Sequence, residues 1–346
     1  MQKAPSKRNA LPTVFGFDFQ VIAGLILTLK NIKNVKNIAI EGPLEDIEIE
    51  LNNGKVIYAQ AKSVVDPLNG NGNGDKFREG LITLDEDSKE NDVEKLIYVS
   101  NTYYPFGKRD NNSQAYWPLS YTNSEYSYTE LKNSTKIDDF ILTFADNNPE
   151  FDLDKFEIHF HKFFDIKNNA TRYTLAYEEI KDFLGKISIN YTPYREDVFE
   201  LWYSRFHWTQ VDKQSLSKED FLWPLIVKLT EKSKDLSEFI DYFEIEGELV
   251  VEISEAYHSL IEGLANSFEI SNLIINDYNN AIKRNELTNF KGTEKYFKYI
   301  NQTWKTFQTK IFFGDPEIEE SVVKLVMWRI LISKRLINKV KEEGGL

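Results

Sequence analysis

Three side chains in the first quarter of the chain are suited to binding a metal ion and a phosphate together. Asp46 begins a short run of alternating acidic and apolar residues, and Gln60 and Lys62 lie near the end of a second run, 56–63. Carboxylate and amide oxygens are suitable ligands for Mg²⁺. An ammonium group can orient water or stabilise charge that develops on a phosphate. These residue types could hold a divalent cation such as Mg²⁺ or Mn²⁺ together with a phosphate.

A hairpin is expected to bring the three side chains together. The two runs are joined by Asn52-Asn53-Gly54, a strong signal for a turn between antiparallel strands. Gln60 and Lys62 are two positions apart, so they lie on one face of their strand, and Asp46 can lie across from them. The alternative is a solvated hairpin without chemistry, because acidic and apolar residues alternate over 46–51 as in any half-buried strand.

A helix is predicted upstream of the hairpin. Val21, Leu25 and Leu29 recur at intervals of four residues, which indicates a helix with one face in the core. Asp18 is positioned to cap its N-terminus. The predicted order is therefore helix, strand and hairpin.

Three motifs within this order resemble the PD-(D/E)xK, restriction-endonuclease-like superfamily, most closely the endonuclease domains of CBASS-type and Lamassu-type anti-phage effectors and HerA-associated nucleases. The resemblance covers roughly the first 100 residues. Gln60 stands where most of the superfamily has an acidic residue, as is typical of the effector subfamily, and this removes one negative charge from the metal site. The motifs are Gly16-Phe17-x-Phe19-Gln20, Glu41-Gly42-x-x-Glu45-Asp46 and Gln60-x-Lys62-Ser63.

The resemblance implies a nuclease core in which Asp46, Gln60 and Lys62 are catalytic and the first two bind the metal. Supporting roles are implied for Gln20, Glu41 and Glu45. The implied partners are double-stranded DNA, further copies of the chain, and an ATPase or sensor subunit such as an SMC-like or HerA-like protein. The implied biological role is bacterial anti-phage defence.

Composition excludes several other classes. The chain has 346 residues, 41% of them hydrophobic, which allows two domains or one large one with a sizeable core. It contains no Cys, so disulfides, thiolate zinc sites and a Cys nucleophile are excluded, and a reducing cytoplasm fits. No stretch reaches the roughly 18 consecutive apolar residues that span a bilayer. We expect a soluble cytoplasmic protein with no membrane contact.

The formal net charge of −13 disfavours a simple nucleic-acid binder, because phosphate contacts need Lys and Arg. A metal-dependent nuclease is still allowed, since its site concentrates acidic residues. We expect weak DNA binding by one subunit, with assembly or a partner completing a positive groove. The charge also favours the rival hypothesis, a non-catalytic interaction or scaffold module that retains a nuclease-like fold.

The pattern beyond the hairpin predicts that an α/β core continues. It contains a loop over 66–75, a helix over 76–84 and a buried strand over 95–100 that leads into Asn101. Residues 102–130, with Trp117, are rich in Tyr, Asn and Ser. Aromatics there could stack on bases, but we expect them to cover a core edge. A strand over 156–163 places His159 and His161 on one face. Without a third ligand nearby in sequence, we expect these histidines to have a packing role.

The second half of the chain has a helical pattern. We predict a nuclease domain over 1–170 and a helical domain for assembly and regulation over 171–346. Its many tryptophans should mostly fill the domain's own core, with a minority at an interface. The predicted helices span 177–184, 196–207, 218–232, 254–275, 294–311 and 318–343.

Overall fold

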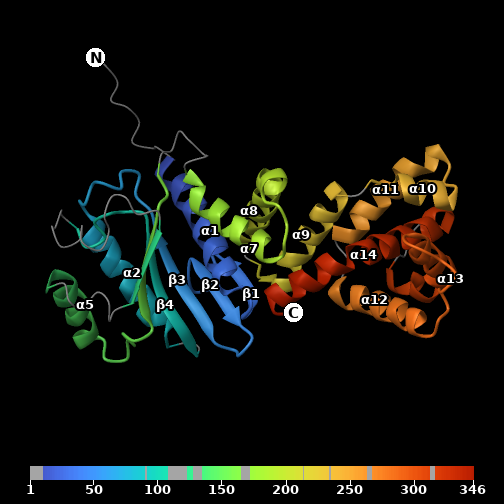
Figure 1. Cartoon of the computed structure of the whole chain (residues 1–346). Coiled ribbons are helices and arrows are strands. Elements are labelled where there is room, and N and C mark those ends of the chain that lie inside the picture. The colour runs from blue at the N-terminus through green and yellow to red at the C-terminus, as the bar shows by residue number, and fades with distance from the viewer. Residues whose placement is uncertain are drawn as a thin grey trace, which may run out of the picture. The chain divides into compact units, whose positions relative to one another are not determined.

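The computed structural model describes residues 11–89, 92–107, 123–127, 135–164, 172–212, 214–233, 235–262, 267–311 and 316–346. By contacts between its elements the chain forms two compact units, Met1–Lys218 and Glu219–Leu346 (Figure 1).

The first unit is built on a seven-stranded sheet of order β5-β6-β4-β3-β2-β1-β7. Strands β3, β4 and β6 run parallel to one another, and the remaining neighbours pair antiparallel. The prediction of a mixed α/β sheet with flanking helices is confirmed. The strands are β1 (Val35–Ile40), β2 (Ile47–Leu51), β3 (Val56–Lys62), β4 (Val93–Ser100), β5 (Asn123–Ser127), β6 (Phe156–His161) and β7 (Leu216–Ser217).

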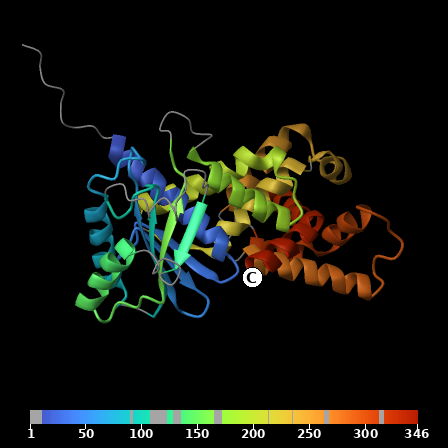
Figure 2. The same ribbon diagram turned by 60° about the vertical axis from the view of Figure 1, so that its left-hand side comes forward.

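Helices pack on both faces of this sheet, as Figures 1 and 2 show. Helix α1 contacts β1, β2 and β3, and α7 and α8 pack on α1. Helix α2 contacts β3 and β4. The helices of the first unit are α1 (Leu11–Asn31), α2 (Asn73–Asp87), α5 (Thr135–Asn147), α7 (Thr174–Lys186) and α8 (Arg195–Asp212), with a short 3₁₀ helix, η1 (Thr192–Tyr194).

Side-chain alternation assigns residues of each strand to one face or the other. Tyr58 and Tyr98 pack with Phe77 and Leu81 of α2 in a buried cluster, so this is the α2 face. Gln60 pairs in register with Tyr98 and therefore lies on the α2 face too. The intervening residues of the strands point to the α1 face.

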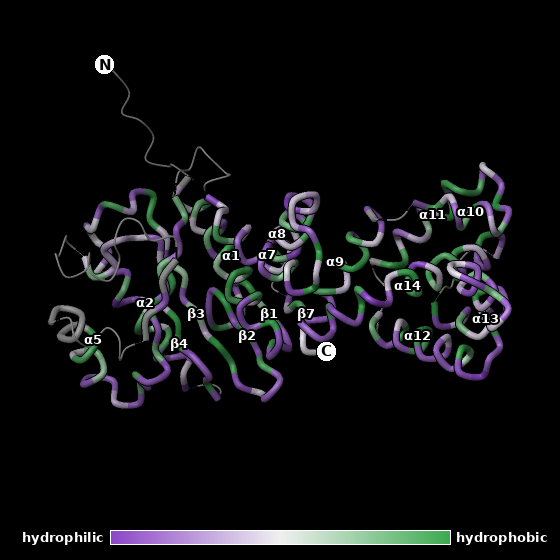
Figure 3. Tube along the Cα trace, viewed as in Figure 1, coloured by the Kyte–Doolittle hydropathy of each residue, from purple (hydrophilic) through white to green (hydrophobic). Residues whose placement is uncertain are grey.

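Helix α1 is the most apolar of the described helices, as the green colour in Figure 3 illustrates. It is the one helix in the described part of the chain that is long and apolar enough to cross a membrane. Within its most apolar window, 72% is buried inside the structure, as expected of a core helix. The cytoplasmic location stays a prediction.

The prediction that Asp18 caps this helix is wrong. Helix α1 begins at Leu11, seven residues earlier. The buried Asp18 carboxylate instead accepts hydrogen bonds from Arg172 Nη1 at 3.0 Å, from the Tyr173 hydroxyl at 3.0 Å and from the Tyr203 hydroxyl at 3.0 Å. This polar cluster ties α1 to the segment around α7 and α8, which the sequence had placed in the second domain.

The first unit therefore extends to Lys218, beyond the predicted domain boundary at residue 170. Helices α7 and α8 cover α1, and β7 adds the last strand to the sheet beside β1. The predicted division assigned every helix after 170 to one domain, because helical periodicity does not reveal which surface a helix covers.

The second unit is entirely helical in its described residues, as the sequence predicted. Helix α14 packs against α11, α12 and α13. The single helix predicted over 254–275 is wrong, because α11 ends at Glu262 and α12 begins at Ser267. The helices are α9 (Lys218–Ser233), α10 (Ser237–Phe243), α11 (Gly247–Glu262), α12 (Ser267–Lys283), α13 (Glu294–Ile311) and α14 (Pro316–Gly344).

Most of the tryptophans fill cores, as predicted. Trp202, Trp223 and Trp328 are buried, whereas Trp208 on α8 is 62% exposed. Tyr103, in the aromatic segment 102–130, is also buried and covers a core edge as expected. Trp117 lies outside the described residues.

We expect Asp18→Ala to destabilise the first unit by about 3–5 kcal/mol, because it removes one partner of a buried ion pair. Tyr203→Phe removes a single hydrogen bond to the same carboxylate and should cost only about 1 kcal/mol. Urea denaturation followed by circular dichroism measures both. A loss below about 0.5 kcal/mol for Asp18→Ala, the range of ordinary surface changes, would contradict this role.

Candidate active site

The structure brings Asp46, Gln60 and Lys62 together on one carboxylate oxygen. Asp46 Oδ2 accepts a hydrogen bond from Gln60 Nε2 and one from the backbone N–H of Ala61 at 2.9 Å. Lys62 Nζ lies 3.8 Å from the same oxygen. The other oxygen, Oδ1, accepts none of the hydrogen bonds found among the described residues. The predicted convergence is observed, while the catalytic and metal-binding roles stay predictions.

The β2–β3 hairpin produces this arrangement. Its register pairs Ile47 with Ala59, so Asp46 stands opposite Gln60 just beyond the end of the ladder. Gln60 and Lys62 share the α2 face of β3. Gln60 is buried, whereas the side chain of Lys62 keeps 33% of its surface exposed. The site therefore combines a buried amide with an accessible ammonium.

The loop before Asp46 is held by Glu48. Its Oε1 accepts the backbone N–H groups of Leu44 at 2.7 Å and Glu45 at 3.0 Å. Gly42 leaves room for this carboxylate, because a Cβ there would lie 2.4 Å from Glu48 Oε1. The glycine in the motif over 41–46 thus serves to position the loop that presents Asp46.

Glu41 supports the same loop through its backbone. Its N–H donates to the carbonyl of Asp46 at 2.8 Å, and it adopts the left-handed conformation with φ of 52°. Such a conformation is uncommon for a residue other than glycine. The Glu41 carboxylate also lies near enough to Asp46 to disfavour its ionised form.

Helix α2 covers the site at Gly80. A Cβ at this position would lie 2.8 Å from the Tyr98 ring and 3.3 Å from Gln60 Cγ. A side chain there would force α2 away from the sheet or displace Gln60. Gly80 therefore allows the helix to pack directly on Gln60, and motif analysis did not identify it.

Asn101 holds the carboxyl ends of the parallel strands together. Its buried side chain accepts the Val64 N–H at 2.8 Å and donates to the carbonyls of Val64 at 2.9 Å and Phe163 at 2.8 Å. Ser100 adds a hydrogen bond from its Oγ to the Lys62 carbonyl at 2.7 Å. These two residues fix the strand end that carries Lys62. In the sequence, only the polar residue that follows a buried strand pointed to them.

Burial and some neighbouring groups act in opposite directions on the pKa of Asp46. Burial raises the pKa of Asp46 above its ordinary value, while Lys62 and the Ala61 N–H oppose that shift. The ionised form is the one that binds a metal cation. Lys62 and the Ala61 N–H therefore favour the ionised form of Asp46, which is the form that can bind a cation.

Glu45 behaves differently from Asp46. Burial, together with the neighbouring charges of Asp46 and Asp87, raises the pKa of Glu45 to about 9. Its Oε2 accepts the Asp46 N–H at 2.9 Å, and its Oε1 is buried. At neutral pH Glu45 is therefore a neutral acid that supports the loop.

Gln20 lies on α1, where its Oε1 accepts a hydrogen bond from Gln210 Nε2 of α8 at 3.0 Å. Within the described residues, no hydrogen bond joins it to Asp46, Gln60 or Lys62. The resemblance implied a supporting role for Gln20 in the site, but no direct contact with the three site residues supports it. The hydrogen bond to Gln210 joins α1 to α8 instead.

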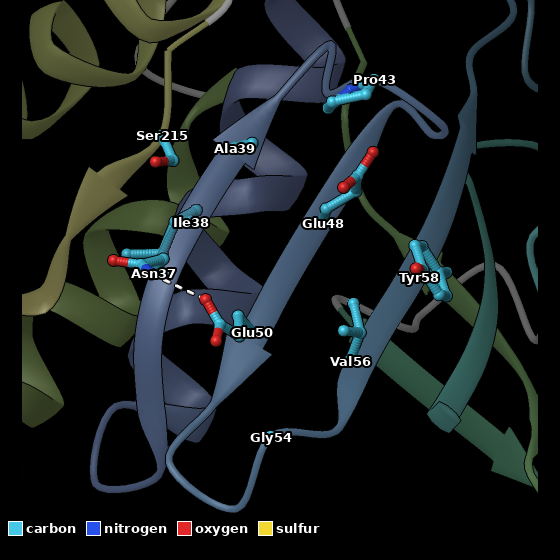
Figure 4. Close-up of a pocket in the computed structure, with 10 residues that line it drawn as sticks. All are labelled: Asn37, Ile38, Ala39, Pro43, Glu48, Glu50, Gly54, Val56, Tyr58 and Ser215. Carbon is cyan, nitrogen blue, oxygen red and sulfur yellow. Dashed lines mark hydrogen bonds between the residues drawn. The ribbon is translucent and has the colours of Figure 1, made fainter. Parts of the chain in front are cut away.

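A groove of about 450 Å³ runs along the hairpin beside the site (Figure 4). Glu48, Glu50 and Tyr58 line it. Hydrogen bonds from Lys36 at 2.6 Å and Asn37 at 2.7 Å hold the pKa of Glu50 below its usual value. An acidic groove does not attract phosphate, so this surface does not supply the positive groove expected for DNA.

No family model matches the sequence, and no curated protein is significantly similar to it. Among solved structures, the chain is similar to the Moraxella osloensis Cap4 SAVED/CARF-domain containing receptor, with 13% identity and a TM-score of 0.40. That match covers 62% of this chain and 47% of the receptor. It is also similar to the Acinetobacter baumannii Cap4 receptor with the cyclic trinucleotide 2'3'3'-cAAA, with 14% identity, a TM-score of 0.38, and coverage of 62% and 45%.

The matched part therefore spans less than half the length of these receptors.

The protonated state of Glu45 predicts a pH-dependent stability. Its folded pKa of about 9 lies above its ordinary value of 4.5, so its stabilising contribution is complete below pH 4.5 and is lost as pH rises to about 9. Glu45→Gln stays neutral, so its stability relative to wild type should increase with pH, by at most about 1.4 kcal/mol per pH unit. Thermal melts from pH 5 to about 9 measure this difference.

The matched control is Glu86→Gln, an exposed glutamate on α2. Its melts over the same pH range give the baseline with which the Glu45→Gln difference is compared. A constant difference for Glu45→Gln would show that Glu45 is ionised in the folded protein and would overturn the assignment.

Proposed function

We propose that this chain is a metal-dependent DNA endonuclease, the effector of a bacterial anti-phage defence system. The observation that carries the proposal is the meeting of Asp46, Gln60 and Lys62 at one carboxylate, at the carboxyl end of β3. The proposed anti-phage role comes from the motif resemblance over the first part of the chain. Double-stranded DNA is the proposed substrate.

The donor set suits a hard divalent cation. Asp46 offers a carboxylate with one oxygen outside the hydrogen bonds of the described residues, and Gln60 offers an amide whose rotation would turn its oxygen toward Asp46. Mg²⁺ prefers such oxygen ligands, usually with one or two carboxylates and several waters. We therefore assign Asp46 and Gln60 as the residues that would hold Mg²⁺ or Mn²⁺. When bound, the ion would supply electrostatic stabilisation of the phosphate.

Lys62 would contribute positive charge at the accessible side of this site. Its side chain is partly exposed and lies 3.8 Å from Asp46, so its ammonium can reach a phosphate at the strand end. There it would orient the attacking water or stabilise the negative charge that develops on the phosphate. Ser100 and Asn101 keep its strand end in place during that step.

The chain's negative charge and its acidic groove suggest that DNA binding requires assembly of several copies or a partner protein. DNA binding depends on Lys and Arg contacts to phosphate, which a single subunit of net charge −13 does not readily supply. Further copies of the chain, or an SMC-like or HerA-like ATPase or sensor subunit, would complete the positive surface. The helical second unit is the proposed site of that control.

Asp46→Asn and Lys62→Ala should each lower DNA cleavage by roughly 10²–10³-fold or more, because each removes charge that acts in the transition state. Lys55→Ala is the matched control, since Lys55 stands just before β3 at its opposite end and pairs with Glu94 at 3.2 Å. A plasmid-cleavage assay with Mg²⁺ or Mn²⁺, repeated with a chelator, measures the effect. Thermal melts should place Lys62→Ala within about 0.5 kcal/mol of wild type.

Full cleavage by well-folded Lys62→Ala would remove Lys62 from the mechanism. If wild type shows no cation-dependent cleavage, alone or with its partner, the scaffold hypothesis replaces the nuclease.

A further inference from the structure

Two buried histidines on the α1 face of β6 carry ring nitrogens without hydrogen-bond partners. His159 and His161 are 3% and 1% exposed. Both ring nitrogens of His161 and Nδ1 of His159 are buried and make no hydrogen bond within the described part of the chain. A buried polar atom left in this state costs free energy, so each such atom calls for an explanation. A bound metal ion is one partner that imidazole nitrogens commonly take.

A third ligand comes from the neighbouring strand. Glu125 of β5 pairs in register with His159, and one ligand atom from each of Glu125, His159 and His161 lies within 4.8 Å of the others. Lys30 of α1 donates to Glu125 Oε1, which leaves Oε2 outside that bond. This strand pairing supplies the ligand that was not visible near the histidines in sequence.

A second carboxylate orients one of the rings. His159 Nε2 lies 2.8 Å from Glu157 Oε2, and Lys95 Nζ lies 2.7 Å from the other oxygen of Glu157. With the Nε2 proton in this bond, His159 Nδ1 carries the lone pair. Metal-binding histidines typically donate their second nitrogen to a carboxylate in this way.

We propose that Glu125, His159 and His161 bind one Zn²⁺ ion. Two imidazoles and a carboxylate are a ligand set that Zn²⁺ accepts, with a fourth position open to water. Zn²⁺ binds His nitrogen at about 2.0–2.1 Å, so the ligand atoms of a tetrahedral site lie about 3.4 Å apart. Small side-chain rotations would close the present spacing to that value.

This site is separate from the proposed nuclease site. Gln60 lies on the α2 face of the sheet, and His159 and His161 lie on the α1 face, where His161 contacts the Phe19 ring. Strand β5 lies at the edge of the sheet, and a zinc ion would connect it to β6 through side chains of both strands. Its effect would therefore be on the stability of this edge rather than on phosphate chemistry.

The test is zinc binding by the full chain, purified without a polyhistidine tag and stripped with a chelator. Native mass spectrometry and calorimetry with ZnSO₄ should give one ion per chain. His161→Phe and Glu125→Gln should weaken binding at least about tenfold. The Phe variant retains a buried ring, and Glu125 is exposed, so both variants are expected to fold. Thermal melts check this.

Two matched variants should keep full zinc binding. His258→Gln changes an exposed histidine that pairs with Glu231 at 3.0 Å in the second unit. Asp46→Asn changes the proposed nuclease site, so its retained zinc binding separates this proposal from that one. Absence of stoichiometric zinc in wild type, or equal affinity in folded His161→Phe, would overturn the proposal.

Discussion

The candidate site depends on one buried amide, the side chain of Asn101. It bonds the backbone that follows β3 and the backbone that follows β6, and it stands directly after β4. The carboxyl ends of three parallel strands are thereby held at one edge of the sheet. In open α/β sheets this edge is where ligands commonly bind. Lys62 ends β3 at this edge, so the position of its ammonium follows from the anchoring of the strands.

The period of two along a strand divides the chemistry of this sheet between its faces. Gln60 and Lys62 point to the face that α2 covers, and Gly80 lets that helix pack against Gln60. His159 and His161 point to the face covered by α1. A shift of one residue in the pairing of β3 or β6 would exchange these faces. The register of the strands therefore decides which side chains can meet, and both candidate sites follow from that register.

The sequence predicted the parts of the fold that depend on local signals. The hairpin over 46–62, the helix over 76–84 and the strands around 95–100 and 156–163 all have periodicity or turn residues that a short window reveals. It did not predict contacts made between distant segments. Asp18 resembles a helix cap in sequence, yet it binds Arg172, Tyr173 and Tyr203, more than 150 positions away. Glu125 likewise meets His159 only through strand pairing.

Protonation is a second property that the sequence could not give, because it depends on burial. Glu45 and Asp46 are adjacent carboxyl residues with the same formal charge, but their surroundings separate their behaviour. Burial raises the pKa of both carboxyl groups, to about 9 for Glu45, but at Asp46 Lys62 and the Ala61 N–H oppose the rise. Pairs of acids driven apart in this way are typical of sites that assign different roles to each member. The neutral Glu45 also lowers the negative charge next to Asp46, so the site is less repulsive to a phosphate than the count of acidic residues implies.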